Sequence, residues 1–130
     1  MKVNAMNYKL PKNERVHSKK SIKELFDKGS SFFLYPFKVL YLDQSIIENG
    51  THQVLFSVSK KKIKKAVHRN FVKRRVKEAY RLHKHLLNHE SEHKKLIALI
   101  YVSTDKSSFE IIQSKIQKIL KKLQTLGHSS

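Results

Sequence analysis

The densest chemical feature of the sequence is a run of positive side chains in the middle of the chain. From Lys60 to Arg81, 11 of the 22 residues are Lys or Arg, and Glu78 is the one acid among them. Like charges four residues apart on a helix repel by about 0.2–0.5 kcal/mol per pair, so this density is unfavourable unless an anion relieves it. Phosphates are the natural complement, because cations that bind them release condensed counterions. The run therefore predicts nucleic-acid binding.

Helical spacing separates this run into two faces. At about 100° per residue, one face is largely apolar and carries Val72, Val76, Ala79, His83 and Leu86. The opposite face carries Asn70, Lys73, Arg74, Lys77 and Arg81. The alternative is an ordinary solvated basic face, but the charge density favours an RNA or DNA partner. The candidate contacts are Lys60, Lys61, Lys62, Arg69, Asn70, Lys73, Arg74, Arg75, Lys77 and Arg81.

Histidines later in the chain form a second group that could do chemistry. The stretch from His89 to His93 matches His-Glu-x-x-His, which binds zinc when both histidines share a helical face and a third ligand is present. No apolar stripe supports a helix there, so we predict neither a catalytic residue nor a metal site. His85, His89 and His93 are spaced by four residues, which leaves adventitious metal binding open if the helix continues.

The other residue types limit the chemistry further. There are 10 acids against 28 Lys and Arg, and no carboxylate cluster indicates a two-metal nuclease site. The chain has no cysteine, which excludes disulfides, thiolate zinc sites and cysteine nucleophiles. The sequence therefore offers no set of residues for a nuclease site on the protein itself.

Size and charge define the protein class. The chain has 130 residues, 39% hydrophobic, enough for one folded domain. A formal charge of +18 attracts nucleic acid, an anionic membrane surface or an acidic protein. The start lacks the apolar run of a signal peptide, and no stretch approaches the ~20 apolar residues of a membrane span. We therefore expect a cytoplasmic protein with no membrane partner.

Hydrophobic periodicity predicts the elements that position the basic run. Helices are expected over 18–29, 65–87 and 109–123, and strands over 31–34, 37–42, 54–59 and 96–102. Ser18 or Ser21 could cap the first helix and Ser107 or Ser108 the last, and Gly29 suits a left-handed position after the first helix. We expect residues 1–16 to form a mobile arm and 126–130 a frayed tail, around a single domain over 17–125.

The element order α-β-β-β-α-β-α implies one four-stranded sheet with helices packed on it, an α/β (α+β) two-layer sandwich. Alternation places Val54, Phe56 and Val58 on one face. The almost wholly apolar run 96–102 predicts a strand buried on both faces.

The strand end and the basic helix together resemble the bacterial ribonuclease P protein family. That family carries Val-Ser-Lys-Lys, followed by a helix with Ala-Val-x-Arg-Asn-Arg-x-Lys-Arg-x-x-Arg-Glu. The matching residues are Val58, Ser59, Lys60, Lys61, Ala66, Val67, Arg69, Asn70, Lys73, Arg74 and Glu78. Phe71 departs from the motif at its third Arg-Asn-Arg position, and Lys77 replaces the later Arg, which keeps the charge but loses the fork. The resemblance covers most of the chain, and the element order agrees.

The resemblance implies a fold and a function. The fold would contain a left-handed βαβ crossover around the basic helix. The function would be that of the RNA-binding subunit of an endoribonuclease, which helps a catalytic RNA with bound Mg²⁺ to remove the 5′ leader from precursor tRNA. The chemistry would belong to the RNA, so the chain would need no cofactor and no obligate protein partner. The alternative is a ribosomal-type or chaperone RNA-binding protein with no role in cleavage.

The same resemblance implies a cleft for the single-stranded leader, lined by aromatic side chains between the sheet and the first helix. Carried over by position, Ile22 replaces one family aromatic, Phe26 keeps another, and Leu40 stands where a strand aromatic is expected. Phe33 and Tyr35 are further candidates. A plain core role for Phe26 is the open alternative.

Overall fold

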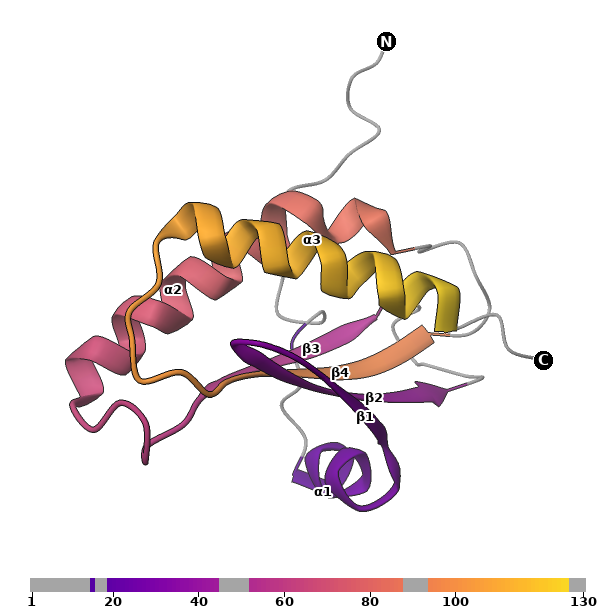
Figure 1. Cartoon of the computed structure of the whole chain (residues 1–130). Helices are drawn as coiled ribbons and strands as arrows, with labels where there is room; N and C mark the ends of the chain where they lie inside the picture. Colours follow the sequence, from indigo (N-terminus) through magenta and orange to yellow (C-terminus); the bar gives the residue numbers. More distant parts are fainter. Residues whose placement is uncertain (1–14, 16–18, 45–51, 88–93, 127–130) are drawn as a thin grey trace, which may run out of the picture.

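The computed structural model describes residues 15, 19–44, 52–87 and 94–126. Its elements follow the predicted order (Figure 1). They are α1 (Lys19–Lys28), β1 (Ser30–Leu34), β2 (Phe37–Gln44), β3 (Gln53–Val58), α2 (Ala66–His83), a 3₁₀ turn η3 (Lys84–Leu86), β4 (Lys94–Tyr101) and α3 (Phe109–Leu126).

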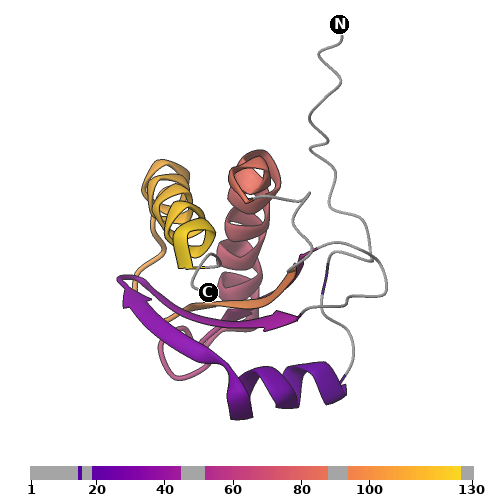
Figure 2. The ribbon, with the colours of Figure 1, turned by 90° about the vertical axis from the view of Figure 1, so that its right-hand side faces the viewer.

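The four strands form one mixed sheet in the order β1-β2-β4-β3. β1 and β4 both pair antiparallel with β2, whereas β3 pairs parallel with β4. α2 and α3 lie side by side over one face of this sheet, and α1 lies against the other face (Figures 1 and 2). The predicted sandwich of one sheet with packed helices is confirmed, with α1 added on the far side.

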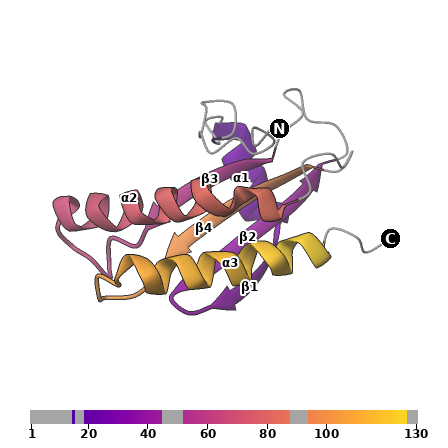
Figure 3. The ribbon, with the colours of Figure 1, turned by 90° about the horizontal axis from the view of Figure 1, so that it is seen from above.

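The connection from β3 through α2 to β4 has the less common hand. Figure 3 views the sheet from the side of α2 and α3; β3 and β4 both run toward the left, and β4 lies below β3. A right-handed crossover, the form found in about 98% of such connections, would place β4 on the other side of β3. The left-handed crossover that the resemblance implied is therefore present.

The larger core fills the space between the sheet and the helices α2 and α3. Val54, Phe56 and Val58 point into it, as the alternation predicts. The apolar stripe of α3 is completely buried there: Ile112, Ile116, Ile119 and Leu123. β4 sends side chains into this core and into the smaller one on the opposite face, which explains its continuous apolar run.

The smaller core lies beneath α1. Leu25 of α1 is fully buried against Leu40, Leu96 and Ala98 of the sheet, and Ile22 packs beside them. In the described part of the chain, this cluster provides the apolar contact between α1 and the strands β2 and β4. α1 is therefore attached by far fewer side chains than α2 or α3.

The start and end of α1 differ from the prediction. α1 begins at Lys19, so Ser21 lies inside the helix and the predicted Ser21 cap is wrong; Ser18 lies outside the described residues. Gly29 does not have a positive φ, so the predicted left-handed conformation is also wrong. The glycine is required by close packing instead, because a Cβ there would lie 2.4 Å from the carbonyl oxygen of Leu25 and 3.0 Å from that of Tyr41.

The structure also gives the end of α2 and decides which serine caps α3. The α-helical part of α2 stops at His83, four residues before the predicted end, and continues as η3. Ser108 caps α3 by accepting a hydrogen bond from the Ile111 amide at 3.3 Å, whereas the Ser107 hydroxyl lies 2.7 Å from the Tyr101 hydroxyl.

The predicted arm and tail fall mostly outside the described residues. The exception is Arg15, which forms an isolated parallel bridge with Val54 along the free edge of β3. At the other end, Leu126 still belongs to α3, although the frayed tail was predicted to begin there.

Candidate nucleic-acid interface

The two faces predicted for the basic helix are present in α2. Val72, Val76 and Ala79 are buried against β3 and α3, and Tyr80 adds an edge-on ring contact with Phe56 at 5.7 Å. Asn70 and Arg74 are exposed on the opposite side, with Lys73, Lys77 and Arg81 partly exposed beside them. Because one side of α2 is fixed in the core, the cations on the other side project from a fixed backbone towards one side of the molecule.

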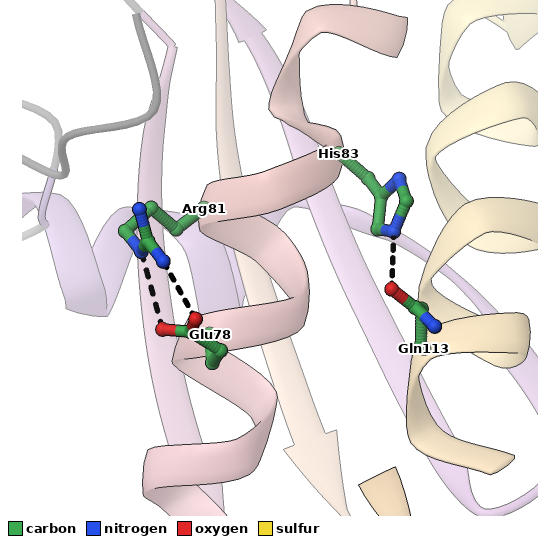
Figure 4. Close-up of polar contacts among 4 residues, drawn as sticks. All are labelled: Glu78, Arg81, His83 and Gln113. Atoms are coloured by element: carbon green, nitrogen blue, oxygen red, sulfur yellow. Dashed lines mark hydrogen bonds and ion pairs between the residues drawn. The ribbon is translucent and has the colours of Figure 1, made fainter. Parts of the chain in front are cut away.

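A polar contact at the end of α2 fixes its rotation against α3. The Nε2 atom of His83 lies 2.8 Å from Oε1 of Gln113 (Figure 4), and Nδ1 lies 3.3 Å from Nε2 of Gln117. One tautomer, with the proton on the histidine Nε2, satisfies both hydrogen bonds. His83 is therefore a structural residue of the face that the spacing predicted.

The loop before α2 presents three further cations. Lys60, Lys61 and Lys62 are exposed on it. Arg69 holds the loop closed, since its Nη1 atom donates hydrogen bonds to the carbonyl oxygens of Ile63 and Lys64 at 2.9 and 2.7 Å. Arg69 therefore uses some of its hydrogen-bond donors within the protein. The three lysines lie together before the amino end of α2.

The flank of α2 next to the β3 edge is repulsive. Burial lowers the pKa of Lys77, and the nearby charges of Lys73 and Arg15 lower it further. The second and third causes show that like charges lie close enough to Lys77 to repel it. A polyanion bound here would remove this repulsion.

The single acid of α2 is already occupied. Glu78 accepts hydrogen bonds from Nε and Nη2 of Arg81 at 3.2 and 2.6 Å (Figure 4), and the bond to Arg81 lowers the pKa of the carboxyl group. The other ion pairs among the described residues, Lys23–Asp27 and Lys95–Asp43, lie away from α2. Arg81 is therefore the one candidate cation of α2 that a carboxylate neutralises in the described part of the chain.

The flank of α2 next to α3 carries an aromatic ring among cations. The guanidinium of Arg75 lies 4.3 Å from the centre of the Phe71 ring, and Nη1 of Arg75 donates to the Ser107 carbonyl oxygen at 3.3 Å. Nζ of Lys106 lies 5.7 Å from the same ring centre. Lys106 was not among the predicted contacts, because nothing in the sequence links it to α2.

The candidate leader residues divide into an exposed group and a packed group. Phe26, Phe33 and Tyr35 are 52%, 60% and 58% exposed, so the core alternative for Phe26 is wrong. Leu40 is buried beneath α1 and Ile22 is half-buried beside it. Both therefore pack α1 against the sheet and are not themselves available to a ligand in the way the exposed rings are. The rings of Phe33 and Tyr35 lie 6.2 Å apart, and the Tyr35 hydroxyl donates to Ser103 Oγ at 3.0 Å.

Lys38 is a residue of this face that the sequence reasoning missed. It is exposed and pairs in register with Phe33, so both point to the face that α1 partly covers. The available signal was the alternation of the strand, in which Phe37 and Val39 face the larger core and Lys38 must face away.

The described residues supply neither a metal cluster nor a membrane span. Within them, no three His, Asp or Glu side chains gather closely enough to hold a metal ion. His85 is exposed, whereas His89 and His93 lie outside the described part of the chain. None of the described helices has the length and apolar character needed to cross a membrane.

Comparison with known proteins gives consistent matches. A family model described as Ribonuclease P matches residues 10–124. The Ribonuclease P protein component of Porphyromonas gingivalis is 39% identical over 114 residues, which cover 85% of this chain and 83% of that protein. The structure of the Staphylococcus aureus RNase P protein is 26% identical with a TM-score of 0.70, over 85% of this chain and 95% of that one. The Thermotoga maritima RNase P protein, at 23% identity and a TM-score of 0.68 over 84% and 96%, supports the fold alone.

Proposed function

Because this chain belongs to the ribonuclease P protein family, we propose that the basic face of α2 binds the RNA subunit. We further propose that the exposed surface on the opposite side of the sheet, beside α1, binds the leader of the substrate. As a member of this family, the chain serves as a subunit of the endoribonuclease, binds the RNA subunit and assists 5′ processing of precursor tRNA. What we propose is which of its two faces binds each RNA.

The observation that carries the proposal is the fixed, uncompensated charge of α2. The RNA-binding set comprises Lys60, Lys61, Lys62, Arg69, Asn70, Lys73, Arg74, Arg75, Lys77 and Arg81. Arg74 and Asn70 are fully available to a ligand, whereas Arg69 and Arg81 already make protein contacts. Cations on a helix that is already folded need no backbone ordering when phosphates bind, and they lower the repulsion between two RNA molecules brought together.

The leader would lie on the exposed aromatic rings of the other face. Phe26, Phe33 and Tyr35 offer surfaces for stacking unpaired bases, and Lys38 beside Phe33 offers a charge for the backbone. Ile22 and Leu40 would contribute indirectly, by packing α1 onto the sheet. Single-stranded RNA suits such a surface, since its bases are free to stack.

We place the bond-breaking chemistry on the RNA subunit with its Mg²⁺ ions. The described carboxylates of this chain do not gather into a set that fits a metal, so no step is assigned to its own residues. No cofactor and no obligate protein partner enter the proposal. The site of action would be the cytoplasm, where precursor tRNA is available.

The test is to mix the full chain with a ribonuclease P RNA and a precursor tRNA at a magnesium concentration too low for the RNA to act alone. The expected result is cleavage at the 5′ end of the mature tRNA, dependent on both RNA and protein. RNA binding without stimulated cleavage would support a chaperone or ribosomal-type protein instead. Cleavage by the purified chain without the RNA subunit would place the chemistry on the protein.

A further inference from the structure

A hollow beside the basic face differs in composition from the rest of α2. Its volume is about 300 Å³, and its lining consists of Phe71, Arg74, Arg75, Glu78 and Phe109. Two aromatic rings, one from α2 and one from the first residue of α3, contribute to a site otherwise made of charged groups. Sites for small ligands begin at about this size, so the hollow suits one flat group rather than a folded segment.

Phe71 has no evident role in the fold. Its side chain is 39% exposed on the polar side of α2, and it belongs to neither of the two cores. A ring that leaves 39% of its surface in water gains less burial energy than a core phenylalanine such as Phe37. Its neighbours are the cations of Arg75 and Lys106, at 4.3 and 5.7 Å from the ring centre.

The charges around the hollow favour an anionic occupant. Arg74, Arg75 and Lys106 contribute three positive charges. Glu78 contributes one negative charge, but both of its oxygens are engaged by Arg81. Arg75 is held by the Phe71 ring on one side and by the Ser107 carbonyl on the other, so its position is set before any ligand arrives.

We propose that this hollow receives one unpaired nucleobase of the RNA subunit, stacked against Phe71, with the flanking phosphates on Arg74, Arg75 and Lys106. Phosphate alone would need the cations but not the rings, whereas a stacked base needs a ring and its backbone needs the cations. The proposal rests on the proposed function and adds to it a contact with a base on a face that otherwise meets only the backbone.

The experiment measures the affinity of the full chain for the RNA subunit over a series of salt concentrations. Phe71→Leu keeps an apolar side chain but removes the ring, and we expect binding to weaken by about fivefold or more with an unchanged salt slope. Phe71→Tyr restores a ring and should bind like the original protein. Ile111→Ala, which removes an exposed apolar side chain of α3 that does not line the hollow, is the matched control and should change nothing.

Two outcomes would overturn the nucleobase. The first is undiminished binding by Phe71→Leu. The second is weaker binding by this variant with a lower salt slope, which would mean that the ring only holds Arg75 against a phosphate. Failure of the original protein to bind the RNA at all would instead overturn the proposed function.

A cross-linking experiment gives an independent readout. With p-benzoylphenylalanine in place of Phe71, irradiation of the complex should attach the protein to one unpaired nucleotide. Attachment spread over helical segments would contradict the proposal.

Discussion

The two sides of the sheet offer RNA two different kinds of surface. On the α2 side, cations project from a helix whose other side is buried, and among the described residues its single acid, Glu78, neutralises Arg81 alone. On the α1 side, the exposed groups are the rings of Phe26, Phe33 and Tyr35, with Lys38 among them. Charge attraction weakens as salt screens it, whereas stacking does not. Under the proposed function, the two RNA partners would be held by forces that respond differently to ionic strength.

The two surfaces also differ in how firmly they are held. α2 packs against β3 and α3 through the larger core, and His83 adds hydrogen bonds to α3. α1 rests on a cluster of only a few side chains. The charged surface therefore lies on a helix that the larger core holds, whereas the aromatic surface combines Phe26 of the lightly attached α1 with Phe33 of the edge strand β1 and Tyr35 of the turn after it. The following predictions use this contrast.

The largest effect is expected from removing two cations of α2. Lys73→Ala with Arg74→Ala should weaken binding of the RNA subunit by roughly 3 kcal/mol, about a hundredfold, because two charged contacts are lost. The salt slope should fall by about 0.7–0.9 for each contact. Equilibrium titration at several salt concentrations measures both. Lys118→Ala with Lys121→Ala, exposed lysines of α3, removes the same charge elsewhere and should have a much smaller effect.

A smaller but still large effect is expected at Gly29. Gly29→Ala places a Cβ 2.4 Å from the Leu25 carbonyl oxygen, so α1 must shift, at a cost of about 1–3 kcal/mol in unfolding free energy. Denaturant unfolding measures the loss, with Ser30→Ala as a neighbouring control. The shift of α1 should weaken the binding of precursor tRNA with a leader more than the binding of the RNA subunit. Equal weakening of both would show that the two surfaces are not independent.

The third effect concerns a single stacked base. Phe33→Leu should weaken binding of precursor tRNA with a leader by about 1 kcal/mol, with the salt slope unchanged, because a ring and no charge is lost. Binding of mature tRNA, which has no leader, should stay the same. Phe33→Tyr keeps the ring and should behave like the original. A loss that also appears with mature tRNA would assign Phe33 to another part of the substrate.

The smallest effect tests the repulsion at the β3 edge. Lys77→Met removes a charge whose pKa is lowered by burial and by Lys73 and Arg15, so the free protein should gain roughly a few tenths of a kcal/mol of stability after solvent screening. RNA binding should weaken at the same time.

The pH dependence of this stability gain follows from the sign of the shift. The unfolded chain holds the Lys77 proton more tightly, so protonation opposes folding below the pKa of the folded state. This penalty disappears as the pH rises through that pKa toward the value in the unfolded chain. Denaturant midpoints of the two proteins should therefore converge at alkaline pH, and a difference that persists there would contradict the explanation.

Local sequence patterns predicted the elements and the charged face, because both depend on spacing alone. The period of α2 separated Val72 and Val76 from Asn70 and Arg74 without reference to any other element. Which side chains α1 buries against the sheet was harder to predict. Leu25 and Phe26 are adjacent in the sequence, yet Leu25 is fully buried and Phe26 is half exposed. The burial of Leu40 depends on where α1 lands, which no local pattern specifies.

Contacts between distant segments could not be predicted. Arg15 lies near Lys77 because it pairs with Val54, and Lys106 lies near Phe71 because the loop before α3 contacts α2 at Arg75. The reason for Gly29 is of the same kind, because the carbonyl of Tyr41 in β2 limits the space. Charge and type at these positions were visible in the sequence, but their neighbours were not.

The place of β4 in the sheet has a consequence for how the chain folds. β4 is the last strand in the sequence, yet it lies between β2 and β3. While the chain is made from its amino end, β1 and β2 can form a hairpin, but β3 has no strand to pair with until residues 94–101 have emerged. Such late, non-local pairing slows folding. During that interval the nascent chain presents the cations of α2 before the sheet that supports the helix is complete. Any RNA close to the site of synthesis can therefore contact these cations before the protein has folded.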